Sequence, residues 1–213
     1  MGSTSRNAGA CLVGAGISFW LAWFLMPLPG TADPAFILDQ VGATPERVWW
    51  SVALQLISCA LFVPGLLGIT LDPKLRTSAS AFAAASLTGV GVTGLAADAI
   101  YHLVAFEMSQ PGVSREAMLP VMVRFQSADL VFVAPQLLAL IAGVAWLAVS
   151  AARAGAVSRL APRLLALALG VAVAGGVAAR AIGVGRREVA LSALALFSLA
   201  IAQLGAGLSR ARS

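Results

Sequence analysis

The chain has 213 residues, of which 60% are hydrophobic and only 11% are charged, and its formal net charge is +5. Soluble domains average about 25% charged residues, so this composition excludes an ordinary soluble protein. The net charge predicts no nucleic-acid binding, because it is the sum of basic and acidic residues in short gaps between apolar stretches.

Six apolar stretches predict an all-α fold, a bundle of six transmembrane helices. A bilayer core of about 30 Å needs roughly 20 apolar residues per helix. We place the spans at about 8–28, 48–71, 80–106, 128–151, 164–184 and 189–208. They fill nearly the whole chain, so we expect a single six-span domain over residues 1–213. The first stretch ends at Met26-Pro27 without a clear small-x-small cleavage site, which favours a retained helix over a signal peptide.

Basic residues occupy alternate gaps between the spans, which predicts the orientation of the chain. Lys and Arg in short loops stay on the cytoplasmic side of a membrane. The basic gaps hold Arg6, Lys74, Arg76, Arg153, Arg159, Arg163, Arg210 and Arg212, and the opposite gaps hold Asp33, Asp39, Glu46, Glu107 and Glu116. We therefore expect a multi-pass protein of a bacterial inner membrane with both termini in the cytoplasm. Arg186 and Arg187 break the rule: they form either an outward-facing basic patch or a sign that the fifth span is misplaced.

Two outer loops carry signals for short helices. Asp33-Pro34 predicts an N-cap and a first-turn proline, with the helix closing near Gly42, and Thr44-Pro45 restarts a helix. Ser114 caps a segment whose apolar residues share one face, which predicts an amphipathic helix at the outer interface before the fourth span. We expect both loop helices to form lids over a cavity that opens toward the outer leaflet.

The third span carries a polar focus. Thr88, Gly91, Leu95, Asp98 and His102 recur at three- and four-residue spacing and so share one helix face. The only histidine of the chain thus follows Asp98 by one turn, and we expect the carboxylate to hydrogen-bond one ring nitrogen. A rise of about 1.5 Å per residue puts the aspartate in the outer third of the bilayer and the histidine near its boundary.

Other spans offer partners for this pair. We expect Asp98, His102, Asp129 and Arg180 to converge, because ionisable groups inside a membrane usually face the bundle interior or a water-filled cavity. Asp98 and His102 are the candidate catalytic residues. The candidate ligand-binding residues are Asp129, Gln136, Arg180, Gln55 and Tyr101, although the side chain of the tyrosine is expected to point off the polar face. Pro135 should kink the fourth span beside this site.

The residue counts exclude several cofactor sites. One histidine cannot supply a bis-histidine haem site or a three-histidine zinc site. A carboxylate-rich metal site from Asp98, His102, Glu107 and Asp129 stays open as an alternative, although its spacing matches no established motif. The chain has neither a nucleophile elbow nor a phosphate-binding glycine loop. We therefore expect no metal and no cofactor.

Three functions are compatible with the polar focus. In the first, the cavity binds a lipophilic small molecule or a lipid, and His102 exchanges a proton as in an isomerase or cyclase, so that whether the chain is an enzyme stays open. In the second, the polar residues only tether helices in a non-catalytic subunit of a homo-oligomer or of a complex with a membrane partner protein. The third is a proton-coupled exporter, which the lack of an inverted repeat disfavours. Membrane lipids are expected partners, since basic helix ends attract anionic headgroups.

Overall fold

The computed structural model describes residues 2–27, 33–182 and 185–210, and their side chains except at 2–5, 179–182 and 210. Over these residues the chain forms eight helices and no strand, which confirms the all-α prediction. Six helical segments are long and apolar enough to cross a membrane, and the fourth of them joins two of the eight helices. The chain therefore has the architecture of an integral membrane protein.

Each predicted span overlaps one long helix, apart from the fourth, which overlaps two. The helices are α1 Gly2–Leu25, α2 Pro34–Ala43, α3 Pro45–Thr70, α4 Ala79–Met108, α5 Arg115–Phe132, α6 Ala134–Arg153, α7 Leu160–Ile182 and α8 Arg186–Arg210. We expected the fourth span to begin at 128, whereas α5 continues to Phe132 and the next helix begins at Ala134. The break falls beside Pro135, which has no N–H to donate to the carbonyl of Val131.

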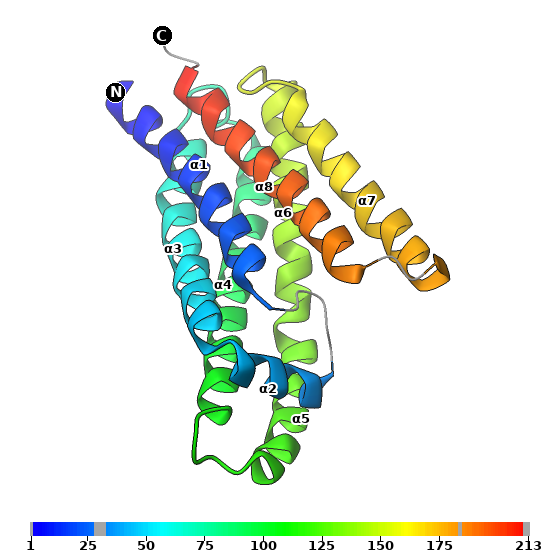
Figure 1. Cartoon of the computed structure of the whole chain (residues 1–213). Helices are drawn as coiled ribbons and strands as arrows, with labels where there is room; N and C mark the ends of the chain where they lie inside the picture. Colours follow the sequence, from blue (N-terminus) through cyan, green and yellow to red (C-terminus); the bar gives the residue numbers. More distant parts are fainter. Residues whose placement is uncertain (1, 28–32, 183–184, 211–213) are drawn as a thin grey trace.

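Six long helices run side by side in a defined order, with both termini at the same end of the bundle (Figure 1). Helix α1 packs between α3 and α8, and α4 packs between α3 and α6. Helix α7 packs mainly on α8 and only weakly on α6. The hydroxyls of Ser51 and Ser58 in α3 donate to the carbonyls of Ala22 and Ala15 in α1, at 2.7 and 2.9 Å, and so tie these two helices together.

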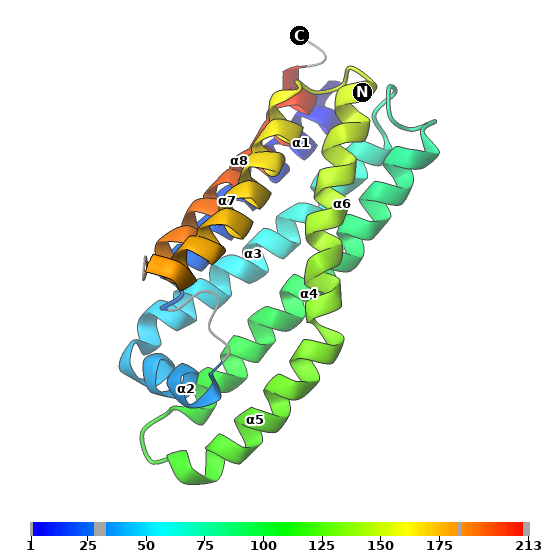
Figure 2. The ribbon, with the colours of Figure 1, turned by 90° about the vertical axis from the view of Figure 1, so that its right-hand side faces the viewer.

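The other end of the molecule is formed by α2, α5 and the last turns of α4. Figure 2 shows α5 continuing α6 past a bend, instead of lying across the bundle end as the expected lid. Part of its apolar face packs on protein, because Met122 is fully buried in a cluster with Leu38 and Val41 of α2 and Ala105 of α4. Helix α5 therefore extends the fourth span beyond the bundle.

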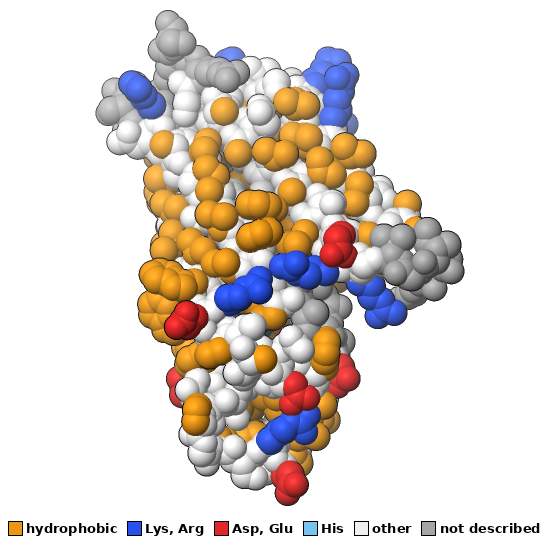
Figure 3. All heavy atoms as spheres, in the orientation of Figure 1, with side chains coloured by type: hydrophobic (Ala, Val, Ile, Leu, Met, Phe, Trp, Pro, Cys, Tyr) orange, Lys and Arg blue, Asp and Glu red, His pale blue; other side chains and the backbone are white. Residues whose placement is uncertain are grey.

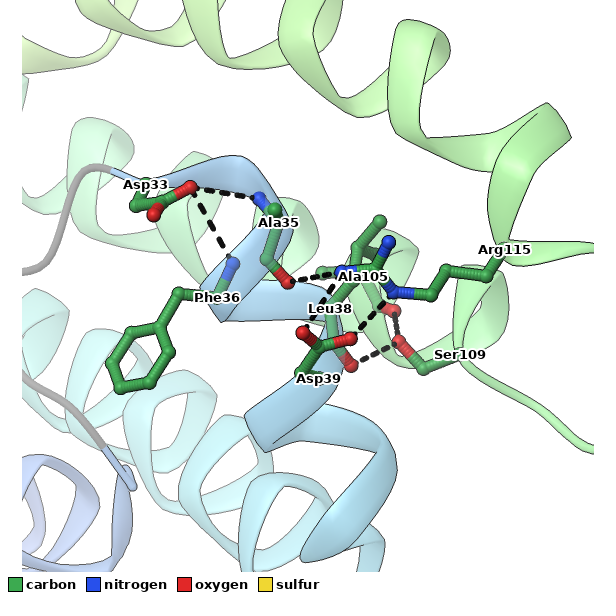
Figure 4. Close-up of polar contacts among 8 residues, drawn as sticks. All are labelled: Asp33, Ala35, Phe36, Leu38, Asp39, Ala105, Ser109 and Arg115. Atoms are coloured by element: carbon green, nitrogen blue, oxygen red, sulfur yellow. Dashed lines mark hydrogen bonds and ion pairs between the residues drawn. The ribbon is translucent and has the colours of Figure 1, made fainter.

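Polar contacts fasten α2 to this end (Figure 4). The predicted cap is present, because the carboxylate of Asp33 accepts from the N–H of Ala35 at 3.1 Å. Arg115 of α5 donates to both carboxylate oxygens of Asp39, at 2.6 and 2.8 Å. These hydrogen bonds, with the positive charge of the guanidinium, hold the pKa of Asp39 below its usual value. The hydroxyl of Ser109 bridges the carbonyls of Leu38 and its own helix.

Charged side chains divide the surface into zones (Figure 3). Hydrophobic side chains cover the stretch between the end with the termini and a row of charged residues at mid-height, and the acidic side chains visible on this face lie at or beyond that row. Arg187 donates to the carbonyl of Phe24 at 3.2 Å, close to the end of α1. This contact satisfies one of the terminal carbonyls that a helix leaves without a partner. The exceptional arginine pair lies at the start of α8, after the end of α7.

Candidate functional site

The polar face of α4 contacts a glutamine of α3 inside the bundle. Gln55 donates to the carboxylate of Asp98 at 2.6 Å and to the carbonyl of Leu95 at 3.1 Å. Gln55 is 1% exposed and Asp98 is 6% exposed. Gln55 lies on the same face of α3 as Ser51 and Ser58, which contact α1. A buried carboxylate with a single amide donor keeps unused acceptor capacity.

His102 lies one turn beyond Asp98, as its spacing predicts, but its closest partner differs from the expected one. The ring Nδ1 is 2.8 Å from the backbone carbonyl oxygen of Asp98 and 3.5 Å from the carboxylate of the same residue. A carbonyl oxygen cannot donate, so Nδ1 carries the proton of this hydrogen bond. In the neutral ring, Nε2 is therefore the nitrogen with the free lone pair.

Two aromatic rings enclose His102. The ring of Trp23 from α1 meets it edge-on, with centroids 6.2 Å apart and an interplanar angle of 88°. The ring of Tyr101 meets it at 5.4 Å and 89°. Tyr101 is buried on the neighbouring face of α4 and stacks on Phe125 of α5, with centroids 5.3 Å apart. Helices α1, α4 and α5 therefore meet around this one histidine.

The structure brings one of the two fourth-span candidates to this cluster. Asp129 of α5 is partly buried and lies within electrostatic range of Asp98 and His102. Gln136 of α6 instead accepts a hydrogen bond from the hydroxyl of Thr93 at 2.9 Å and donates to the carbonyl of Phe132, the last residue of α5. Its hydrogen bonds thus lie about a turn away from the carboxylate of α4.

Arg180, the fourth ionisable group expected here, lies outside the residues whose side chains the structure describes. Its backbone belongs to the last turns of α7. The expected convergence of Arg180 with the carboxylates stays a prediction.

Three buried polar atoms around His102 have no hydrogen-bond partner among the described residues. They are Nε1 of Trp23, the hydroxyl oxygen of Tyr101 and Oδ1 of Asp129. Most buried polar groups in proteins have a partner, because leaving one unpaired costs about 1–3 kcal/mol. One indole donor, one hydroxyl and one carboxylate acceptor thus offer hydrogen bonds to a group that enters this cluster. We call Trp23, Asp98, Tyr101, His102 and Asp129 the outer polar cluster.

Trp23 is the member of the outer polar cluster that sequence reasoning missed. It lies in the first span, among other aromatic residues, and nothing in its spacing relates it to α4. An aromatic residue near the outer end of a span is typical of the interfacial belt, which is the reading its position favours. Only the packing of α1 beside α3 carries its ring to His102.

Within the described residues, no group of three His, Cys, Asp or Glu side chains is arranged to hold a metal ion. The outer polar cluster offers two carboxylates and one imidazole, with Asp98 already engaged by Gln55. Carboxylate and imidazole groups can form hydrogen bonds and exchange protons. No protein-family model, curated protein or solved structure matches this chain.

Proposed function

We propose that this integral membrane protein binds the polar end of a lipophilic small molecule or lipid at the outer polar cluster. The observation that carries the proposal is the set of three unpaired buried atoms on Trp23, Tyr101 and Asp129. A ligand with one hydroxyl group beside an apolar body suits such atoms, because a hydroxyl accepts from an indole or phenol donor and donates to a carboxylate oxygen. Its body then lies among apolar side chains. Small-molecule sites commonly combine an apolar lining with a few placed polar groups.

His102 and Asp98 extend the proposal from binding to acid–base chemistry. The hydrogen bond from Nδ1 to the carbonyl of Asp98 orients the ring and leaves Nε2 as the base. The carboxylate 3.5 Å from the ring stabilises the imidazolium that forms when Nε2 takes up a proton. A lipophilic substrate that loses a proton at one carbon and gains one at another, as in isomerisation or cyclisation, suits this arrangement.

A second function is favoured by one contact. The hydrogen bonds from Gln55 to Asp98 and to the carbonyl of Leu95 join α3 to α4 inside the bundle. Such a contact serves a non-catalytic subunit equally well, because polar side chains commonly tether helices within membranes. Under this alternative Tyr101 and His102 have no ligand to contact, and their replacement affects only stability.

The two functions are separated by native mass spectrometry of the protein in lipid nanodiscs. We expect wild type to retain a molecule of defined mass and His102→Ala to lose it or to retain a chemically altered form. Tyr101→Phe should also reduce retention, yet raise the free energy of unfolding of the ligand-free protein by about 1 kcal/mol, since it removes an unpaired buried hydroxyl. Thermal unfolding of the delipidated protein checks the second effect.

Ser198→Ala in α8 is the matched control, because it also removes a buried hydroxyl that has no partner among the described residues. It should stabilise the protein in the same way and leave ligand retention unchanged. Equal retention in wild type, His102→Ala and Tyr101→Phe would refute the binding proposal and favour the tethering function.

We infer that the chain resides in a bacterial inner membrane with both termini in the cytoplasm. The end of the bundle that holds the termini also holds the basic gaps, which supports this orientation. Cysteines introduced at Lys74 and Glu116, both exposed and at opposite ends, test it in a background without Cys11 and Cys59. A membrane-impermeant maleimide should label Glu116→Cys in intact cells and Lys74→Cys only after permeabilisation. The reverse pattern would invert the topology.

A further inference from the structure

We propose that a pocket between α6 and α7, at the end of the bundle that holds both termini, binds the phosphate of an anionic phospholipid headgroup. The pocket has a volume of about 510 Å³ and is broadly open to its surroundings. It is lined by Val149, Ala152, Arg153, Arg159, Pro162 and Arg163. Pockets of about 300–1,000 Å³ are typical of small-molecule sites. The inference does not depend on the function proposed for the outer polar cluster, which lies at the opposite end.

The three arginines of this pocket have no acidic neighbour to balance them. No ion pair is present at Arg153, Arg159 or Arg163 among the described residues. Asp72 is the one acidic residue among the gaps at this end, and its carboxylate accepts from the backbone N–H of Lys74. The ammonium group of Lys74 in turn donates to the carbonyl of Gly155, in the α6–α7 loop, at 2.9 Å. A fourth cation therefore lies beside the pocket.

Two arginines lie at the start of α7, where their positive charges favour the binding of an anion. The N-terminus of a helix carries a partial positive charge, which acidic residues usually complement. The first turn of α7 holds no acidic residue and instead holds Arg163, and Arg159 immediately precedes the helix. Repulsion between these charges and the helix dipole is relieved when an anion lies among them. Arg153 differs, because a cation at the end of α6 is favourable on its own.

The surroundings favour a lipid headgroup over a free phosphate ion. Half of the lining residues, Val149, Ala152 and Pro162, are apolar. Large apolar side chains continue from the pocket along the outer surface of α7, where Leu160 and Leu167 are 45% and 54% exposed. Acyl chains lie along such a surface, while the guanidinium groups hold the phosphate at the boundary of the apolar zone. Basic pockets between transmembrane helices bind anionic headgroups by this division of contacts.

The test measures lipid binding by native mass spectrometry of the full-length protein in detergent. The probes are dioctanoyl-phosphatidylglycerol, dioctanoyl-phosphatidylcholine and inorganic phosphate. We expect wild type to bind the phosphatidylglycerol in preference to the zwitterionic lipid. The double variant Arg159→Gln/Arg163→Gln should bind it about thirtyfold more weakly, since each arginine near a headgroup contributes about fivefold to affinity.

The matched control is Arg6→Gln/Arg76→Gln, which removes two exposed arginines from the same end and changes the net charge equally. It should retain the wild-type affinity. An equal loss in both double variants would overturn the proposal and indicate general attraction between charges. Equal binding of the two lipids by wild type would also overturn it, and this comparison needs no variant to fold. Inorganic phosphate that binds as tightly as the phosphatidylglycerol would replace the lipid site by a free-anion site.

Discussion

Gly91→Ala is expected to destabilise the bundle by about 2–3 kcal/mol, because it forces apart the closely packed helices α4 and α6. Gly91 of α4 faces the backbone of Leu140 in α6. A Cβ atom at this position would overlap the backbone nitrogen and Cα of Leu140, which cannot rotate away as a side-chain end can. Gly143 of α6 makes the reciprocal contact with the backbone of Thr88. The two helices thus approach closely through small residues, as membrane helices often do.

Gly89→Ala in the same helix is the control, since a Cβ atom there has no neighbour within 4 Å. Both substitutions raise the helix propensity of α4 equally, by about 1 kcal/mol at most. Gly89→Ala should therefore be neutral or slightly stabilising. Reversible unfolding in mixed detergent micelles measures both variants. Equal stabilities would mean that α4 and α6 do not pack through Gly91.

Gln55→Leu is expected to cost about 2–4 kcal/mol, because it leaves the buried carboxylate of Asp98 without its amide donor. The difference in cost between replacing Gln55 and replacing Asp98 tests this reason. Asp98→Leu should cost less than Gln55→Leu, since Gln55 keeps its second acceptor, the carbonyl of Leu95. The double variant should lose less stability than the sum of the single variants, with a coupling energy of about 1–2 kcal/mol.

Ser58→Ala provides the comparison for this tether. Ser58 lies on the same face of α3, is equally buried, and donates to a helix carbonyl of α1 at 2.9 Å. Ser58→Ala removes a hydrogen bond between neutral groups and leaves no buried charge without a partner. Its expected cost is therefore about 0.5–1.5 kcal/mol. Equilibrium unfolding of the four variants settles the order. A Gln55→Leu protein as stable as wild type would contradict the buried tether between α3 and α4.

The ligand-retention experiment and the unfolding experiment on Gln55 and Asp98 test different residues of one site. Gln55 and Asp98 hold α3 to α4, whereas Tyr101 and Asp129 carry atoms that no described residue satisfies. A loss of stability in Gln55→Leu together with a loss of retention in Tyr101→Phe would assign both roles to neighbouring residues. The tether then positions the histidine helix, and the unpaired atoms contact the ligand.

Local regularities made much of the fold predictable from sequence. Runs of about 20 apolar residues identify membrane spans because the bilayer thickness sets that length. Asp98 and His102 lie one turn apart because they belong to one helix, and Asp33 caps α2 through contacts within three residues. Pro135 marks the helix break because the missing N–H is a property of the residue itself. Each of these features depends on near neighbours in the chain.

Helix α5 runs along the line of α6 and not across the end of the bundle, and this direction differs from that of the expected lid for a reason of packing. Its amphipathic pattern indicates an apolar face, but does not say whether lipid or protein covers that face. Met122 is covered by α2 and α4, and this contact directs the helix along the line of α6. Periodicity therefore predicted the helix, and only its neighbours decided its direction.

By itself, the sequence determined that this is a bundle of six long helices, that its polar residues gather near one end, and that its basic gaps gather at the other. Only the tertiary structure decided which helices are neighbours: that Trp23 reaches His102, that Gln55 meets Asp98, and that Arg187 contacts the end of α1. The physical reason lies in the solvent. Lipid is as apolar as a protein core, so a hydrophobic side chain suits either, and hydropathy alone does not reveal which face of a helix another helix covers.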